Sequence, residues 1–155
     1  MQMDYVPLDP DWDAKVRGIF AAQGFMSMLG IELTEVRPGF VEMVVAHRPE
    51  LTQQGGFFHG GLMGALVDNS GGCAAGTLMG PGLDVLAVEY KVNMLRPGAG
   101  ERLRVVARVI KPGKTLCICR SDVFVLKGTD ETLCAAGQGT YIYIPHRPAP
   151  AWATA

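Results

Sequence analysis

The chain has 155 residues, 48% of them apolar, and a formal net charge of −1, which suits one domain over residues 1–155 and not two. The balanced charge gives no reason to expect nucleic acid or an anionic membrane as the main partner. Because the acidic N-terminus lacks the features of a secretion signal and no stretch approaches roughly 18 uninterrupted apolar residues, we expect a cytoplasmic protein.

Two short helices are predicted at the start of the ordered part. Apolar residues in Trp12–Gln23 recur at the spacing of one helix face, and Asp11 stands where a capping side chain is expected. The residues FMSMLG then indicate a further helical turn that ends at Gly30. After it, Ile31–Val36 and Phe40–Ala46 have the composition of strands and are joined by the turn sequence RPG, which predicts a β-hairpin.

The segment from Gly60 to about Met79 lacks strand character, and its local signals conflict. The sequence NSGG favours a turn, since a glycine inside a helix costs about 1 kcal/mol relative to alanine. At 100° per residue, however, large and small residues separate onto opposite sides, and Asp68 lies on the small-residue side. We therefore predict one continuous helix whose glycine side lets another group approach its backbone. The alternative is a helix that ends at Val67.

Four further segments are rich in β-branched and aromatic residues and are separated by RPGAG, KPG and KGTDE, which are loop or turn sequences. Short links between successive strands predict an antiparallel meander, and the whole chain is then an α+β fold. We expect an ordered core over about residues 12–145 and a loose tail over 146–155. The predicted strands are Leu83–Leu95, Arg102–Lys111, Thr115–Leu126 and Thr132–Ile144.

The four cysteines are most simply buried, reduced thiols. Cys117 and Cys119 share one face of a predicted strand, which is the arrangement of half a metal site. The three histidines supply no second pair of ligands at a suitable spacing. We therefore expect no metal and no cofactor.

Four strings, QGFMSMLG, LTQQGGFFHGG, LVDNSGGCAAG and VEYKVNMLRPGAGE, resemble the PaaI-like branch of hotdog-fold acyl-CoA thioesterases, in the 4-hydroxybenzoyl-CoA thioesterase superfamily. The resemblance spans about Phe20–Ile144 and depends on the order and spacing of the strings. It implies a hotdog fold, in which an antiparallel sheet wraps around one long central helix, with a short N-terminal helix before it. It also implies hydrolysis of an acyl-CoA by a homodimer or a dimer of dimers.

The resemblance assigns roles to single residues. Asp68, nine positions after His59, would act as general base or nucleophile, and the backbone N–H of Gly60 would hold the oxyanion. Gln53, six positions before the histidine, would hold the carbonyl or the water. In similar enzymes the acid and the donor come from different subunits. His59 is better explained as a support for the site than as a proton carrier, and Gln53 is equally well explained as an ordinary loop amide.

The residues suit thioester hydrolysis even without the resemblance. Thioester hydrolysis needs a nucleophile, a donor for the oxyanion and a dry site for the acyl group. The N–H groups of Gly60 and Gly61 at a helix N-terminus favour developing negative charge. A partly buried Asp68 would be a stronger base.

One position departs from the pattern. Several relatives have Ser or Thr at the start of the strand after the helix, and here that residue is Ala87. Either Asn69 or Ser70 replaces the missing hydroxyl, or Gln53 and Asp68 alone hold the water.

Substrate-binding candidates surround these positions. Phe58 is a core residue or part of an acyl tunnel, and Gly61 and Asn69 lie next to the catalytic candidates. Arg96 and Lys114, with other basic residues at strand ends, are the cations that could bind the phosphates of CoA. The resemblance slightly favours medium or long fatty acyl groups over aryl groups.

The sequence argues against two other functions. A hotdog hydratase would carry a D-x-x-x-x-H dyad or an H-F-P-G opening, whereas Gln54 stands five residues before His59 and the opening is HGGL. A non-catalytic acyl-CoA-binding module would lack the helix acid, and Asp68 argues against it.

Overall fold

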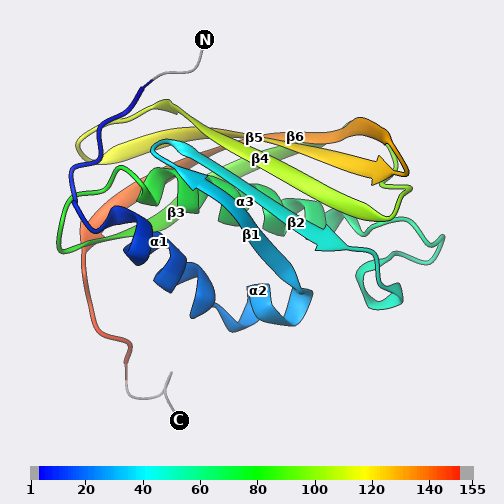
Figure 1. Ribbon diagram of the computed structural model, residues 1–155, viewed down its shortest axis with the longest axis horizontal. Coiled ribbons are helices and arrows are strands. Elements are labelled where there is room, and N and C mark those ends of the chain that lie inside the picture. The colour runs from blue at the N-terminus through cyan, green and yellow to red at the C-terminus, as the bar shows by residue number, and fades with distance from the viewer. Residues whose placement is uncertain (1–3, 151–155) are drawn as a thin grey trace.

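The computed structural model describes residues 4–150. A six-stranded antiparallel sheet curves around the long helix α3, and the two short helices α1 and α2 lie on the other side of α3 in this view (Figure 1). The helices are α1 Trp12–Ala21, α2 Gly24–Leu29 and α3 Gly60–Gly76, with a 3-10 turn at Pro49–Leu51. The strands are β1 Ile31–Arg37, β2 Phe40–Ala46, β3 Leu83–Met94, β4 Arg102–Lys111, β5 Leu116–Lys127 and β6 Asp130–Pro145.

The first hairpin is confirmed. β1 and β2 pair from Ile31 with Val45 to Arg37 with Phe40. Gly39 closes the turn at a φ of 71°, a conformation that glycine adopts without strain.

The predicted meander of four strands is wrong in one respect. The sheet order is β1-β2-β4-β5-β6-β3, so β4, β5 and β6 are successive neighbours while β3 lies beside β6 at the far edge. The sequence RPGAG is therefore a crossing loop and not a hairpin turn. Its Gly98 accepts a hydrogen bond from the backbone of Phe58 at 3.0 Å and leaves no room for a Cβ beside Met63 and Phe58. The loop packs on the start of α3 and carries the chain from β3, at the edge of the sheet, to β4, which lies between β2 and β5.

Helix α3 is continuous through DNSGG, as the helical phase predicted. Its large side chains, Leu62, Met63, Leu66 and Val67, are buried under the sheet. Tyr141 of β6 packs against its glycine side, so closely that a Cβ on Gly71 would stand 2.1 Å from the hydroxyl oxygen. This enclosure outweighs the poor helix propensity of the glycines, because most helical stability in proteins comes from tertiary packing.

The start of the fold differs from the prediction in two details. Helix α1 ends at Ala21, two residues earlier than predicted, and the side chain of Asp11 makes no capping hydrogen bond. The buried carboxylate of Asp9 instead accepts from the N–H of Asp11 at 3.0 Å and lies 3.6 Å from the Lys15 ammonium. The Asp9 carboxylate, two residues before the capping position, therefore accepts the N–H at this end of the helix, and the Asp11 side chain does not act as a cap.

The C-terminal residues and the cysteines are the remaining features of the fold. Residues 146–150 have no regular structure, and the rest of the predicted tail, 151–155, lies outside the described residues. All four cysteines are unpaired and buried, as expected. In residues 4–150, no helix is long and apolar enough to cross a membrane.

Candidate active site

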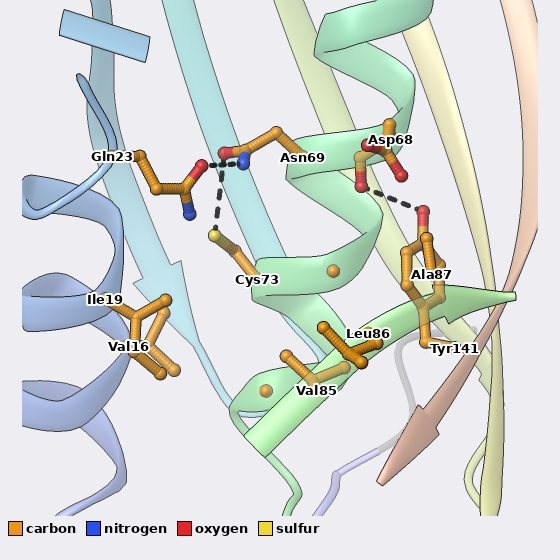
Figure 2. A pocket seen from close by; sticks show the side chains of 12 residues that line it. Val16, Ile19, Gln23, Asp68, Asn69, Cys73, Val85, Leu86, Ala87 and Tyr141 are labelled. Carbon is orange, nitrogen blue, oxygen red and sulfur yellow. Dashed lines mark hydrogen bonds between the residues drawn. The ribbon is translucent and has the colours of Figure 1, made fainter. Parts of the chain in front are cut away.

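Most of the predicted site residues line one of two pockets at different levels of α3. The first, which we name the acid pocket, has a volume of about 140 Å³ and lies between α1, α3 and β3 (Figure 2). It is lined by Val16, Ile19, Gln23, Asp68, Asn69, Gly72, Cys73, Gly76, Val85, Leu86, Ala87 and Tyr141. Its walls are mainly apolar, and Asp68 is the acidic residue among them.

Asp68 is held firmly by its backbone. The hydroxyl of Tyr141 donates to the carbonyl oxygen of Asp68 at 3.0 Å, as the dashed line in Figure 2 shows. Burial raises the pKa of the Asp68 carboxyl above its ordinary value, because the charged form loses hydration. A carboxylate in this position is a stronger base than one in water.

The carboxamide side chains of Asn69 and Gln23 lie in the acid pocket with Asp68. Gln23 was not among the site residues predicted from the sequence. The side-chain nitrogen of Asn69 donates to the carboxamide oxygen of Gln23, which lies between α1 and α2. Asn69 also accepts a weak bond from the Cys73 thiol at 3.8 Å. Burial and the nearby Asp68 charge raise the pKa of this thiol to about 12, so Cys73 is a neutral wall residue.

The structure distinguishes between the residues that could replace the hydroxyl missing at Ala87. Ala87 lines the acid pocket, so its methyl group faces the space where a hydroxyl would act. Ser70 cannot replace it, because its hydroxyl is fully buried and lies 3.1 Å from that of Ser121. Asn69 does line the acid pocket and remains available for this role.

The second pocket, which we name the loop pocket, lies at the start of α3 and has a volume of about 540 Å³. The structure brings Gln53, Phe58, Gly60 and Arg96 together there. The remaining lining residues are Phe57, Met63, Met94, Leu95, Pro97 and Gly98. Lys114 stands in the link between β4 and β5 and lines neither pocket.

The start of α3 is capped by His59. Its Nδ1 accepts from the N–H of Gly61 at 2.9 Å, which is the supporting role favoured for this histidine. Gly61 is thereby corrected as a donor for substrate, because its N–H is already bound. Among the described residues, no group accepts the N–H of Gly60, and Gly60 lines the loop pocket.

Gln53 takes part in its own loop. Its side-chain oxygen accepts the N–H of Gly55, and its backbone N–H donates to Phe57 at 2.9 Å. The structure therefore supports the loop-amide explanation for the oxygen, while the side-chain nitrogen is still a donor in the loop pocket.

The two halves of the predicted site cannot act on one carbonyl within a single chain. Gly60 and Asp68 are eight residues apart on a continuous helix, which separates their backbones by about 12 Å. Both would have to lie within about 3 Å of the reacting group. The Asp68 carboxylate and the N–H of Gly60 therefore cannot serve the same carbonyl within one chain.

Strand β3 contributes to both pockets and is the edge strand of the sheet. It provides Ala87 to the acid pocket and Met94 to the loop pocket. Its Leu86, Val88 and Tyr90 are 53%, 56% and 44% exposed. An edge strand with exposed apolar side chains is a template for pairing with another strand.

Comparison with known proteins identifies relatives of this chain. The sequence profile of the thioesterase superfamily matches residues 55–132, a range that includes Gly60 and Asp68 but neither Gln53 nor α1. Acyl-coenzyme A thioesterase 13 of Homo sapiens is 31% identical over 110 residues, which are 70% of this chain and 78% of the human protein.

Solved structures agree with this result. A thioesterase family protein from Silicibacter pomeroyi is 36% identical and superposes with a TM-score of 0.85 over 87% of this chain and 99% of its own. The E. coli PaaI protein from the phenylacetic acid degradation operon superposes with a TM-score of 0.78 over 88% of this chain and 96% of its own. At 21% identity, the second likeness concerns the fold.

Proposed function

The chain belongs to the thioesterase superfamily and is a thioester hydrolase of the hotdog fold, and from this premise we propose that it hydrolyses acyl-CoA thioesters with Asp68. The observation that carries the proposal is the position of this carboxylate. It lies half-buried in a mainly apolar pocket, and burial raises its pKa. Acyl-CoA as substrate agrees with the resemblance of the HGG and DNSGG segments to PaaI-like enzymes.

The reaction proceeds by addition and elimination at the thioester carbonyl. Asp68 acts as general base on a water molecule, or as nucleophile. In the first case the carboxylate takes one proton from water and the hydroxide adds to the carbonyl carbon. The tetrahedral intermediate then expels the CoA sulfur, which takes the proton from Asp68, and the products are the free acid and CoA.

The oxyanion is held by the N–H of Gly60 from a second subunit. The distance of about 12 Å along α3 supports this arrangement, and the exposed edge of β3 offers a surface for it. When two copies of β3 pair edge to edge, the sheet continues across a two-fold axis and the interface is isologous. The acid pocket of one subunit then meets the loop pocket of the other, which makes a homodimer the smallest active unit.

CoA enters from the loop-pocket side. Arg96 lines this pocket and donates to the carbonyl oxygen of Leu133 at 3.1 Å through one nitrogen. Its other N–H groups are available for a phosphate, with which a guanidinium forms strong charge-assisted bonds. Lys114 is not part of this pocket and is not included in the proposal.

Substitution of Asp68 tests the mechanism. Asp68→Asn keeps the shape of the side chain and removes the base, so we expect thiol release from acyl-CoA to fall by about 10²- to 10⁴-fold. Asp130→Asn, the same change at the exposed first residue of β6, is the matched control and should leave the rate unchanged. Both variants should keep the circular dichroism spectrum and the assembly state of the parent.

Two results would count against the proposal. Undiminished hydrolysis by Asp68→Asn would remove Asp68 from the mechanism. Tight binding of acyl-CoA by the unmodified protein without any turnover would indicate a binding module instead of an enzyme.

A further inference from the structure

Building on the proposed function, we propose that the acid pocket receives the acyl group and that α1 limits this group to about the size of a phenyl ring or a six-carbon chain. The substrates are then compact acyl-CoA thioesters such as benzoyl-CoA or hexanoyl-CoA. Neither the thioesterase profile nor the catalytic residues determine this preference, because α1 lies outside the matched range.

The distribution of charge fixes the direction in which the substrate lies. The phosphates of CoA need a cation, and the loop pocket contains Arg96. The lining of the acid pocket contains no Lys, Arg or His. With the thioester carbonyl between Asp68 and Gly60 of the partner subunit, CoA extends toward the loop pocket. The acyl group on the other side of the carbonyl must extend into the acid pocket.

The floor of the acid pocket is closed by three elements. Val16 of α1, Gly76 of α3 and Val85 of β3 meet there, since a Cβ on Gly76 would stand 3.4 Å from Val16 and 3.6 Å from Val85. Val16 is 1% exposed, so its side chain cannot move into solvent. The acyl group therefore enters a blind pocket and not a tunnel.

The wall formed by α1 is fixed in place. The carboxamide of Gln23 accepts from Asn69, and its backbone N–H donates to Phe20 at 3.1 Å. The first bond ties the C-terminal end of α1 to α3 one residue after Asp68, and the second holds Gln23 against the last turn of α1. Figure 2 shows Ile19 and Val16 on this helix, facing the pocket from the side opposite Val85 and Leu86.

The volume sets the size limit. The acid pocket measures about 140 Å³, and a buried apolar cavity of about 150 Å³ holds one benzene molecule. A longer fatty chain does not fit without displacement of α1. The sequence resemblance slightly favours medium or long chains, whereas this volume favours a compact acyl group.

One glycine allows the pocket to be filled without damage to the fold. Gly72 lines the acid pocket, and a Cβ there would meet the Tyr141 ring at 3.5 and 3.7 Å, which is ordinary contact. Gly72→Ala therefore adds a methyl group inside the pocket at a tolerated helix position. Gly18→Ala makes the same change on α1, where a Cβ meets nothing within 4 Å, and is the matched control.

The experiment compares kcat/KM of the full-length protein for acetyl-, hexanoyl-, benzoyl-, dodecanoyl- and palmitoyl-CoA. We expect hexanoyl- or benzoyl-CoA to exceed palmitoyl-CoA by at least tenfold in the unmodified protein. Gly72→Ala should lower kcat/KM for benzoyl-CoA at least fivefold relative to acetyl-CoA, and Gly18→Ala should leave this ratio unchanged. Ile19→Ala, which removes part of the α1 wall, should move the preference toward dodecanoyl-CoA.

The outcomes separate this inference from the proposed function. Best activity with palmitoyl-CoA, together with no effect of Gly72→Ala, would overturn the size limit and leave the thioesterase assignment intact. Absence of turnover with every acyl-CoA would overturn both. The dissociation constants of the same thioesters for the Asp68→Asn variant give a second measurement, and equal affinity for benzoyl- and palmitoyl-CoA would also overturn the size limit.

Discussion

Gly71 and Gly72 are adjacent glycines in α3 that should respond in opposite ways to the same substitution. A Cβ on Gly71 would stand 2.1 Å from the Tyr141 hydroxyl oxygen and 2.7 and 2.9 Å from two ring carbons. Tyr141 is 1% exposed and donates to the carbonyl of Asp68, so neither the ring nor the helix can move freely. On Gly72 the nearest ring carbons are at 3.5 and 3.7 Å, and no shift is needed.

The magnitudes follow from these distances. Gly71→Ala incurs an overpacking cost of about 1–3 kcal/mol and weakens a hydrogen bond that contributes about 1 kcal/mol. It gains about 1 kcal/mol in helix propensity, so the net loss of unfolding free energy is about 1–3 kcal/mol. Gly72→Ala keeps the propensity gain without the overpacking. The two variants should therefore differ by about 2–4 kcal/mol.

Urea denaturation at one fixed protein concentration measures the difference, because the stability of an oligomer depends on concentration. Adding Tyr141→Phe to Gly71→Ala removes the atom at 2.1 Å and should recover part of the loss, since the two residues are in contact and their effects are not additive. If Gly71→Ala proved as stable as Gly72→Ala, Tyr141 would not pack on the helix through DNSGG. The enclosure that explains the glycine-rich helix would then be refuted.

Three further predictions concern the acid and the edge strand. Because burial raises the pKa of Asp68 and the proposed mechanism uses its ionised form, kcat/KM should fall as pH decreases through a value above the ordinary carboxyl range near 4; an acid limb at or below that range would contradict this. The folded state also binds the Asp68 proton more tightly than the unfolded state does, so ionisation of Asp68 destabilises the fold. The free energy of unfolding of Asp68→Asn should therefore be at least that of the parent at pH 7, and the difference between the two should disappear in acid. Val88→Lys, on the exposed edge of β3, should yield a monomer of reduced activity in sedimentation and thiol-release assays, whereas Val88→Thr should keep both; a fully active monomer would exclude a shared site.

Helical phase predicted α3 correctly where turn propensity did not. The residues DNSGG form turns when they are exposed, since glycine gains little from a helix. Here Tyr141 and Tyr143 enclose this part of the helix, and their hydroxyls donate to the carbonyls of Asp68 at 3.0 Å and Ala75 at 2.9 Å. The periodic placement of large residues carried this information, because burial of one face decides the helix in a packed domain.

The place of β3 and the partner of Asn69 could not be predicted in the same way. The sequence RPGAG has the composition of a hairpin turn, and its role as a crossing loop depends on contacts with Phe58 and Met63, about 35 to 40 residues earlier in the chain. Gln23 lies 46 residues from Asn69 and reaches it only because α1 packs on α3. Neither contact leaves a pattern in the neighbouring sequence, so both can be identified only from the three-dimensional structure.

The glycines of α3 meet different needs on one helix. Six of its 17 residues are glycine, at a propensity cost of about 1 kcal/mol each in the interior. Gly71 admits Tyr141 from within the same chain, Gly72 leaves space in the acid pocket one turn from Asp68, and Gly76 lets Val16 and Val85 meet at the floor of that pocket. Gly60, about 12 Å away along the helix, presents its N–H at the other pocket. A single helix can therefore carry an acid for one site and an oxyanion donor for the next, which is why the proposed catalysis requires two chains.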